Sequence, residues 1–186
     1  AIPMKQFGAE IFVADLIALS TLRELGPLMT AIVMAGRTSS AFAAELGTMK
    51  VNEEVDALTT MGLDPVRFLV LTRVIATLFM MPLITIFANL FGILGGSVVL
   101  LSMGYPLNTY IDRIIQSADY VDLLGGLLKS LAFGLIVAGI GCSHGLRTRT
   151  GASAVGDSTT KAVVSGIIMI ILRSEERRVG KECRSR

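Results

Sequence analysis

Three charged residues lie well inside long apolar stretches of this sequence, one of which also contains Asp15 nearer its start. Arg23 and Glu24 fall inside a mainly apolar run over residues 10–35, and Lys129 is the only charge in residues 123–143. An ionisable side chain at the centre of a bilayer costs about 2.5–3.5 kcal/mol on insertion scales, so such residues normally face protein or water. We therefore predict that these three residues line or gate a cavity. The alternative is a buried ion-pair network that only locks helices together.

Other residues capable of chemistry lack the partners that chemistry needs. His144 is the only histidine, and Cys142 lies two residues before it. A metal site or an activated nucleophile needs a third ligand or an orienting acid, and the sequence places neither beside this pair. We predict a helix-end role for His144, with no catalytic and no metal-binding residue in the chain.

A glycine-containing segment has the spacing of a phosphate-binding loop. It reads Gly151-x-x-x-x-Gly156-Asp157-Ser158, but Asp157 stands where that loop requires Lys. A carboxylate there would repel the phosphates that the Lys should hold. The sequence therefore predicts that any ATP is bound by a separate subunit.

Long uncharged runs set the class of protein. Hydrophobic residues make up 52% of the chain and charged residues 17%, against about 25% charged in soluble domains. Residues 74–103 are thirty consecutive positions without a charge. Since about 20 mainly apolar residues cross a bilayer as a helix, we predict an all-α, polytopic transmembrane helical bundle.

We expect three spans. The first covers residues 10–35, the second begins at Val66 or Val74 and ends at residue 101, and the third covers residues 123–143. A loop over residues 144–161 should follow the third span. A further span begins at Ala162 and is too short to cross before residue 173. An α-helix rises 1.5 Å per residue, so Arg23 and Glu24 should lie roughly 13–20 Å below the outer end of the first span. By the same rise, Lys129 should lie roughly 9 Å below the outer end of the third span. Lys129 should therefore be able to approach Glu24.

Proline and glycine mark points where these helices bend or approach closely. Pro27 removes a backbone hydrogen bond beside the charged pair and should loosen that helix, and Pro82 should bend the second span. The Gly92-x-x-x-Gly96 pair should allow another helix to pack closely against it.

The last residues, 173–186, do not fit this pattern. They read RSEERRVGKECRSR and resemble the translation of a sequencing-library adapter, so we interpret them as non-native and exclude them from the fold. The alternative is a natural basic tail that binds anionic lipid headgroups. Without them the formal charge falls from +2 to −1, with 11 Lys and Arg against 12 Asp and Glu, which gives no indication of nucleic-acid binding.

Positive charges indicate the orientation of the spans. The loop over residues 36–73 has four Lys or Arg, that over 104–122 has one, and that over 144–161 has three. By the positive-inside rule, the first and third of these loops are cytoplasmic and the second faces outward.

The polar insert between the first two expected spans carries a helix near residues 39–61 with an apolar stripe. Its other faces are mostly acidic, and they should be repelled by an anionic inner leaflet. Docking on a protein partner is therefore favoured over an interfacial helix that rests on the membrane.

The insert also carries a family resemblance. The segments LRELGP (residues 22–27) and AGRTSSAFAAELGTMKVNEEVDALTTMGLDPVRFLVLTR (residues 35–73), with the region of Gly92 and Gly96, closely resemble the MlaE (YrbE) permeases of Mce-type ABC transporters. The resemblance covers residues 1–172, which would form one permease domain that lacks the first span and most of the last.

That resemblance implies a five-span permease of the bacterial inner membrane, working as a homodimer with a cytoplasmic ABC ATPase and a periplasmic MCE-domain protein. It implies transport of phospholipids or related lipids between the inner membrane and the cell envelope, with ATP bound by the ATPase. The insert would be the coupling helix, and its candidate contact residues are Glu45, Met49, Lys50, Glu53, Glu54 and Asp56. The three membrane charges would line the lipid cavity.

Two other functions remain open from the sequence. One is a membrane scaffold or lipid-binding subunit without transport. The other is an intramembrane lipid-modifying enzyme, against which the single histidine at a membrane edge argues.

Overall fold

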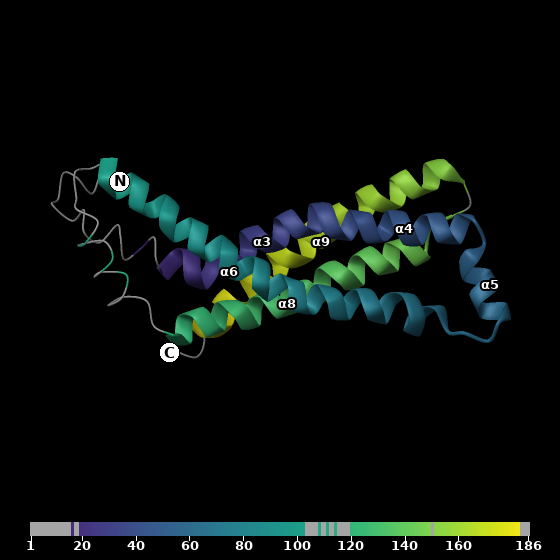
Figure 1. Ribbon diagram of the computed structural model, residues 1–186, viewed down its shortest axis with the longest axis horizontal. Coiled ribbons are helices and arrows are strands. Elements are labelled where there is room, and N and C mark those ends of the chain that lie inside the picture. Colours follow the sequence, from purple (N-terminus) through teal and green to yellow (C-terminus); the bar gives the residue numbers. More distant parts are fainter. Residues whose placement is uncertain are drawn as a thin grey trace. The chain divides into compact units, whose positions relative to one another are not determined.

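A computed structural model describes residues 16, 19–102, 108, 111, 114, 120–149 and 151–182, with side chains as far as Glu175 except at positions 100 and 152. Every element in these residues is helical (Figure 1). In order they are η1 (Thr21–Leu25), α3 (Gly26–Met34), η2 (Ala35–Ser39), α4 (Ser40–Val51), α5 (Glu54–Thr60), η3 (Val66–Val70), α6 (Leu71–Ser102), α8 (Tyr120–Leu146) and α9 (Ala152–Glu182), where η marks a π-helical turn.

Three of the described helices are long and apolar enough to cross a membrane. They cover Val66–Val99, Tyr120–Leu146 and Ser153–Glu175. The predicted all-α, polytopic transmembrane bundle is confirmed, and so are the expected second and third spans. The beginning of the first expected span lies largely outside the described residues. The rest of it is helical from Leu19 onward.

The start of the last helix differs from the prediction. Instead of a loop over residues 144–161, only residues 147–151 separate α8 from α9. The polar residues at the start of α9 satisfy their own groups, because the hydroxyls of Ser158 and Thr159 donate to the carbonyls of Val155 (2.9 Å) and Gly156 (2.7 Å). Hydroxyl groups bonded in this way are compatible with a helix. The helix thus begins ten residues before Ala162, and the expectation of a span too short to cross is wrong.

The chain divides into two compact units. The first contains residues 1–30 and 82–130, and its described core is the close approach of η1 to α6 and α8. A Cβ on Gly92 would lie 2.6 Å from Cγ2 of Thr21, and one on Gly126 would overlap the Leu22 carbonyl oxygen. Gly96 is also buried. Small residues let helix backbones approach in this way.

Near Pro27 the helix of the first unit is π-helical. The Gly26 N–H donates to the carbonyl of Thr21, five residues back, and Pro27 itself is fully buried. Because Pro27 has no N–H, the regular hydrogen-bond ladder is interrupted here, which accommodates the wider turn. Helix α6, by contrast, continues through Pro82.

The second unit contains residues 31–81 and 131–186, and in it α4 packs against α8 and α9 (Figure 1). A Cβ on Gly145 of α8 would lie 2.7 Å from Cβ of Leu46, and one on Gly47 would lie 3.0 Å from Oγ1 of Thr148. The insert and the 147–151 linker therefore lie side by side. The charge pattern predicts the same side of the membrane for these two segments.

The helix expected over residues 39–61 is divided in two. Helix α4 ends at Val51, and α5 begins at Glu54 and lies across the end of α4 (Figure 1). Between them Glu53 has a left-handed backbone with φ 62°, and an ion pair between Lys50 Nζ and Asp56 Oδ1 (2.7 Å) spans the break. The insert is a helical corner, and Gly62 (φ 77°) ends its second helix.

Because Glu53 has a left-handed backbone, a substitution to glycine at this position should stabilise the chain. Glu53→Gly should stabilise the chain by about 1 kcal/mol, because a non-glycine residue in this conformation costs about 1–2 kcal/mol. The control Ala57→Gly, in the interior of α5, should instead destabilise it by about 1 kcal/mol. Thermal unfolding in detergent would measure both, and equal losses in the two variants would contradict the assigned backbone.

Candidate functional site

The three predicted membrane charges are all paired within the first unit. The Lys129 ammonium donates to the Glu24 carboxylate, so the predicted approach of these two residues is confirmed. Arg23 Nε lies 3.1 Å from Oδ1 of Asp122. Asp122 and Lys129 are seven residues apart on α8, about two turns, and so share one face of that helix. Arg23 and Glu24 are neighbours that cannot pair along one helix face, and each reaches its own partner on α8.

The two sides of these ion pairs differ in exposure. The side chains on α8 are 8% exposed at Lys129 and 17% at Asp122, whereas those on η1 are 49% exposed at Arg23 and 51% at Glu24. The η1 charges therefore present a polar surface that has further capacity for hydrogen bonds. In a membrane such a surface must meet water, a lipid headgroup or another protein.

Asp122 was not among the predicted site residues. It lies just before the expected start of the third span. A charged residue is common at the end of a span, so its presence there did not indicate a site. Its separation of seven residues from Lys129 is the one signal that could have identified it, because it places both on one helix face.

A buried amide lies close to this site. Asn89 of α6 is 3% exposed, and neither its Oδ1 nor its Nδ2 has a hydrogen-bond partner among the described residues. A Cβ on Gly26 would overlap the Asn89 amide. Glycine at position 26 is thus what allows this amide to lie against η1.

The predicted coupling residues fall into two groups. Glu45 Oε2 lies 2.8 Å from Nη1 of Arg73, whose guanidinium sits 5.5 Å from the ring centroid of Phe42. This cluster joins α4 to the start of α6, just as the Lys50–Asp56 pair joins α4 to α5.

The second group is open to a partner. Glu54 is exposed and has no ion pair in the described part of the chain, Glu53 forms the corner, and Met49 is half-buried. Beyond α5 the apolar side chains of Met61 and Leu63 are also exposed, and the sequence did not single them out. Exposed apolar groups that are rimmed by polar ones mark surfaces for a protein partner or for the membrane.

Within the described residues, no three His, Cys, Asp or Glu side chains gather in a way that could hold a metal ion. Cys142 is buried as a free thiol.

Comparisons with known proteins agree with this architecture. A protein-family model described as "Permease MlaE" matches residues 1–174. A probable ABC transporter permease protein of Synechocystis sp. is 44% identical over 168 residues, which are 89% of this chain and 64% of that protein. One from Rickettsia typhi is 38% identical over 168 residues, 90% of this chain and 65% of that protein.

A plant relative also matches. The chloroplastic protein TRIGALACTOSYLDIACYLGLYCEROL 1 of Arabidopsis thaliana is 39% identical over 170 residues, which are 90% of this chain and 48% of that protein. The chain thus spans less than two thirds of the length of these relatives. With a family match over almost all of its own length, this chain belongs to the MlaE permease family.

Proposed function

We propose that this chain is the membrane-spanning permease subunit of an ABC transporter that moves phospholipids or related lipids between the inner membrane and the cell envelope of a bacterium. Membership of the MlaE family and relatives named as ABC transporter permeases support the transporter class. A relative whose name contains that of a galactolipid supports a lipid as the cargo. Phospholipids and glycolipids are the two cargo classes to compare.

The observation that carries the coupling part of this proposal is the helical corner of α4 and α5. Helix α4 is packed into the second unit through the buried residues Ala43, Leu46 and Gly47, whereas most of α5 is exposed. A rigidly held helix followed by an exposed short helix can transmit the movement of a docked partner into the spans. We assign that partner as a separate cytoplasmic ATPase subunit that binds the ATP.

The ion pairs of the first unit are the proposed contact with the cargo. Arg23 and Glu24 each have about half of their side chain exposed, so they can exchange bonds with a lipid headgroup while Asp122 and Lys129 stay buried. A homodimer would place two such surfaces around one cavity, and a periplasmic MCE-domain protein would receive or deliver the lipid.

Charge reversal on α5 tests the docking surface. Glu54→Lys should weaken binding of the ATPase subunit to the full-length permease about fivefold, the effect of one lost favourable charge contact of about 1 kcal/mol. It should also lower lipid-stimulated ATP hydrolysis. Thr160→Lys is the control, because it adds a lysine to an exposed position of α9. If both variants bind the ATPase like the wild type, α5 is not the docking helix.

Reconstituted transport tests the function as a whole. Vesicles with the full-length permease, its ATPase and labelled phosphatidylethanolamine or monogalactosyldiacylglycerol should show ATP-dependent lipid movement for one of the two lipids. ATP-independent conversion of the lipid would favour the enzyme alternative, and neither movement nor conversion would favour the scaffold.

A further inference from the structure

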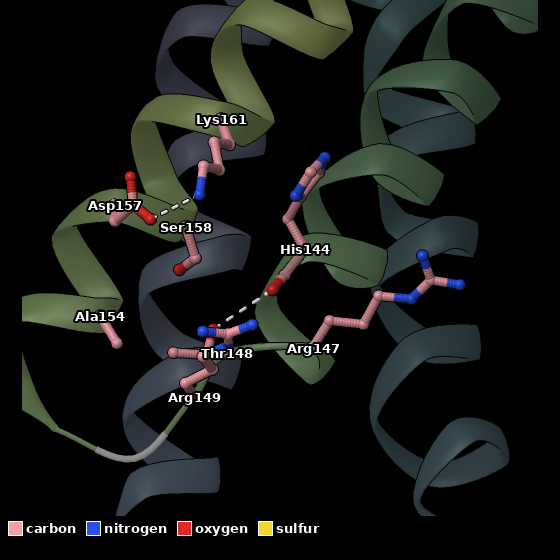
Figure 2. A pocket seen from close by; sticks show the side chains of 8 residues that line it. All are labelled: His144, Arg147, Thr148, Arg149, Ala154, Asp157, Ser158 and Lys161. Carbon is pink, nitrogen blue, oxygen red and sulfur yellow. Dashed lines mark hydrogen bonds and ion pairs between the residues drawn. The ribbon is translucent and has the colours of Figure 1, made fainter.

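A small polar cavity lies in the second unit, where α8 ends and α9 begins. Its volume is about 260 Å³. Figure 2 shows its eight lining residues, which are His144, Arg147, Thr148, Arg149, Ala154, Asp157, Ser158 and Lys161. None of these residues belongs to the ion pairs of the first unit or to α5. The function proposed above gives this cavity no role.

Positive groups outnumber negative ones around the cavity. Three lining side chains are cationic (Arg147, Arg149 and Lys161), and one, Asp157, is anionic. Asp157 Oδ2 is bound to Lys161 Nζ at 2.6 Å. No ion pair of either arginine is found among the described residues, and in Figure 2 Arg147 extends away from α9. Arg149 is therefore the cation with no carboxylate partner that faces the cavity.

The hydroxyl groups that line the cavity already donate hydrogen bonds to backbone carbonyls. Ser158 Oγ donates to the Val155 carbonyl (2.9 Å), and Thr148 Oγ1 donates to the His144 carbonyl (3.2 Å). The donors left for a ligand are the guanidinium and ammonium groups and the His144 ring. A planar guanidinium matches two oxygens of a phosphate, which makes Arg149 the expected primary contact.

The volume of the cavity and its position in the chain limit the kind of ligand that it can bind. Sites for drug-sized ligands measure about 300–1,000 Å³, so a cavity of about 260 Å³ suits a phosphate group better than a whole nucleotide. The cavity lies between the end of the membrane-spanning segment Tyr120–Leu146 and the start of Ser153–Glu175. Lipid phosphates lie at that depth, and basic pockets between transmembrane helices bind them.

We propose that this cavity binds a phosphate group at the membrane surface, with Arg149 and Lys161 as its main contacts. The phosphate is that of an anionic lipid headgroup or a free phosphate ion. Thr148 and Ser158 also contact α4 at Gly47, within 3.0 Å and 3.6 Å of where its Cβ would stand. The bound phosphate would thus lie against the same helix that carries the docking corner.

The test is binding of dioleoylphosphatidic acid to the purified full-length permease in detergent, measured by native mass spectrometry. Dioleoylglycerol, which has the same chains and no phosphate, is the matched ligand control. Arg149→Gln should weaken binding of phosphatidic acid about tenfold, as expected for loss of a charged hydrogen bond. The control Arg67→Gln removes the same charge from a side chain that is 88% exposed and outside the cavity, and should change binding by less than about twofold.

A second variant should strengthen binding, which a misfolded protein could not imitate. Asp157→Asn removes the carboxylate that is paired with Lys161, so the ammonium becomes free to bind phosphate. The affinity for phosphatidic acid should rise about two- to fivefold, which corresponds to the free energy of one exposed ion pair. Equal affinity of the wild type, Arg149→Gln and Asp157→Asn for phosphatidic acid and for inorganic phosphate would overturn the proposal. So would variants that lose only the ATPase subunit, because the basic cluster would then serve a protein partner.

Inorganic phosphate distinguishes the two sources of the ligand. If inorganic phosphate displaces phosphatidic acid, and the variants rank in the same order of affinity for both ligands, the cavity is a site for free phosphate. If it neither binds nor competes while phosphatidic acid does, the ligand is the lipid headgroup. Both outcomes support the phosphate site.

Discussion

Replacing Glu24 with Gln should destabilise the chain by about 2–3 kcal/mol. Lys129 is 8% exposed, and loss of its partner leaves a nearly buried ammonium without a counter-charge. Breaking a buried pair in this way costs about 3–5 kcal/mol, and the half-exposed position of Glu24 reduces that figure. Lys129→Met should cost less, about 1 kcal/mol, because the Glu24 carboxylate that remains can find other partners at the surface.

The double variant Glu24→Gln with Lys129→Met should recover most of the lost stability, since neither charge is then stranded. Stability is best measured as the midpoint of thermal unfolding in detergent, followed by circular dichroism. Removing the exposed pair of Lys161 and Asp157, both more than 60% exposed, is the control and should change stability by less than about 1 kcal/mol. Equal losses from the two single variants would contradict the burial of Lys129.

The same double variant separates the two roles of the ion pair. If it folds with normal stability but no longer supports lipid transport in reconstituted vesicles, Glu24 and Lys129 act on the cargo. If it transports lipid like the wild type, the pair only locks η1 to α8.

Gly126→Ala should destabilise the first unit by about 1–3 kcal/mol, the usual cost of forcing an extra group into a packed interior. Its Cβ would overlap the Leu22 carbonyl oxygen, a backbone atom that cannot turn aside as a flexible side chain could. The substitution must therefore push η1 away from α8. The same movement would lengthen both ion pairs between these helices.

The adjacent residue provides the control for this substitution. A Cβ on Gly125 would have nothing within 4 Å, so Gly125→Ala should be neutral or stabilise the helix by up to about 1 kcal/mol through its higher helix propensity. Thermal unfolding in detergent would compare the two variants. A loss of stability at position 125 as large as at position 126 would show that the glycines act through the helix and not through the contact with Leu22.

Much of this architecture could be predicted from the sequence because a membrane imposes strong local rules. An uncharged run such as residues 74–103 has few alternatives to a spanning helix, since charges and unsatisfied backbone groups are costly in lipid. The segment Gly62-Leu63-Asp64-Pro65 predicts a turn, and the structure has Gly62 at φ 77° and a new helix directly after Asp64. The long insert motif was specific enough to identify the family.

Other features depended on groups that are distant in the sequence. The partner of Arg23 is Asp122, and the partner of Arg73 is Glu45. Such pairs depend on the rotation and depth of two helices, which no spacing within one helix reveals. The phosphate cavity likewise needs α9 to begin at Ala152 so that residues of two helices and their linker face one space.

The sequence by itself determined that this chain crosses a membrane, belongs to a permease family and carries a polar insert, because each of these follows from local composition or a contiguous motif. Only the tertiary structure decided that the insert is a corner with a left-handed Glu53, that η1 is held to α8 by two ion pairs, and that a basic cavity forms behind α4. These features arise from packing between segments, where glycines set the distance between helices and burial selects which charges can pair.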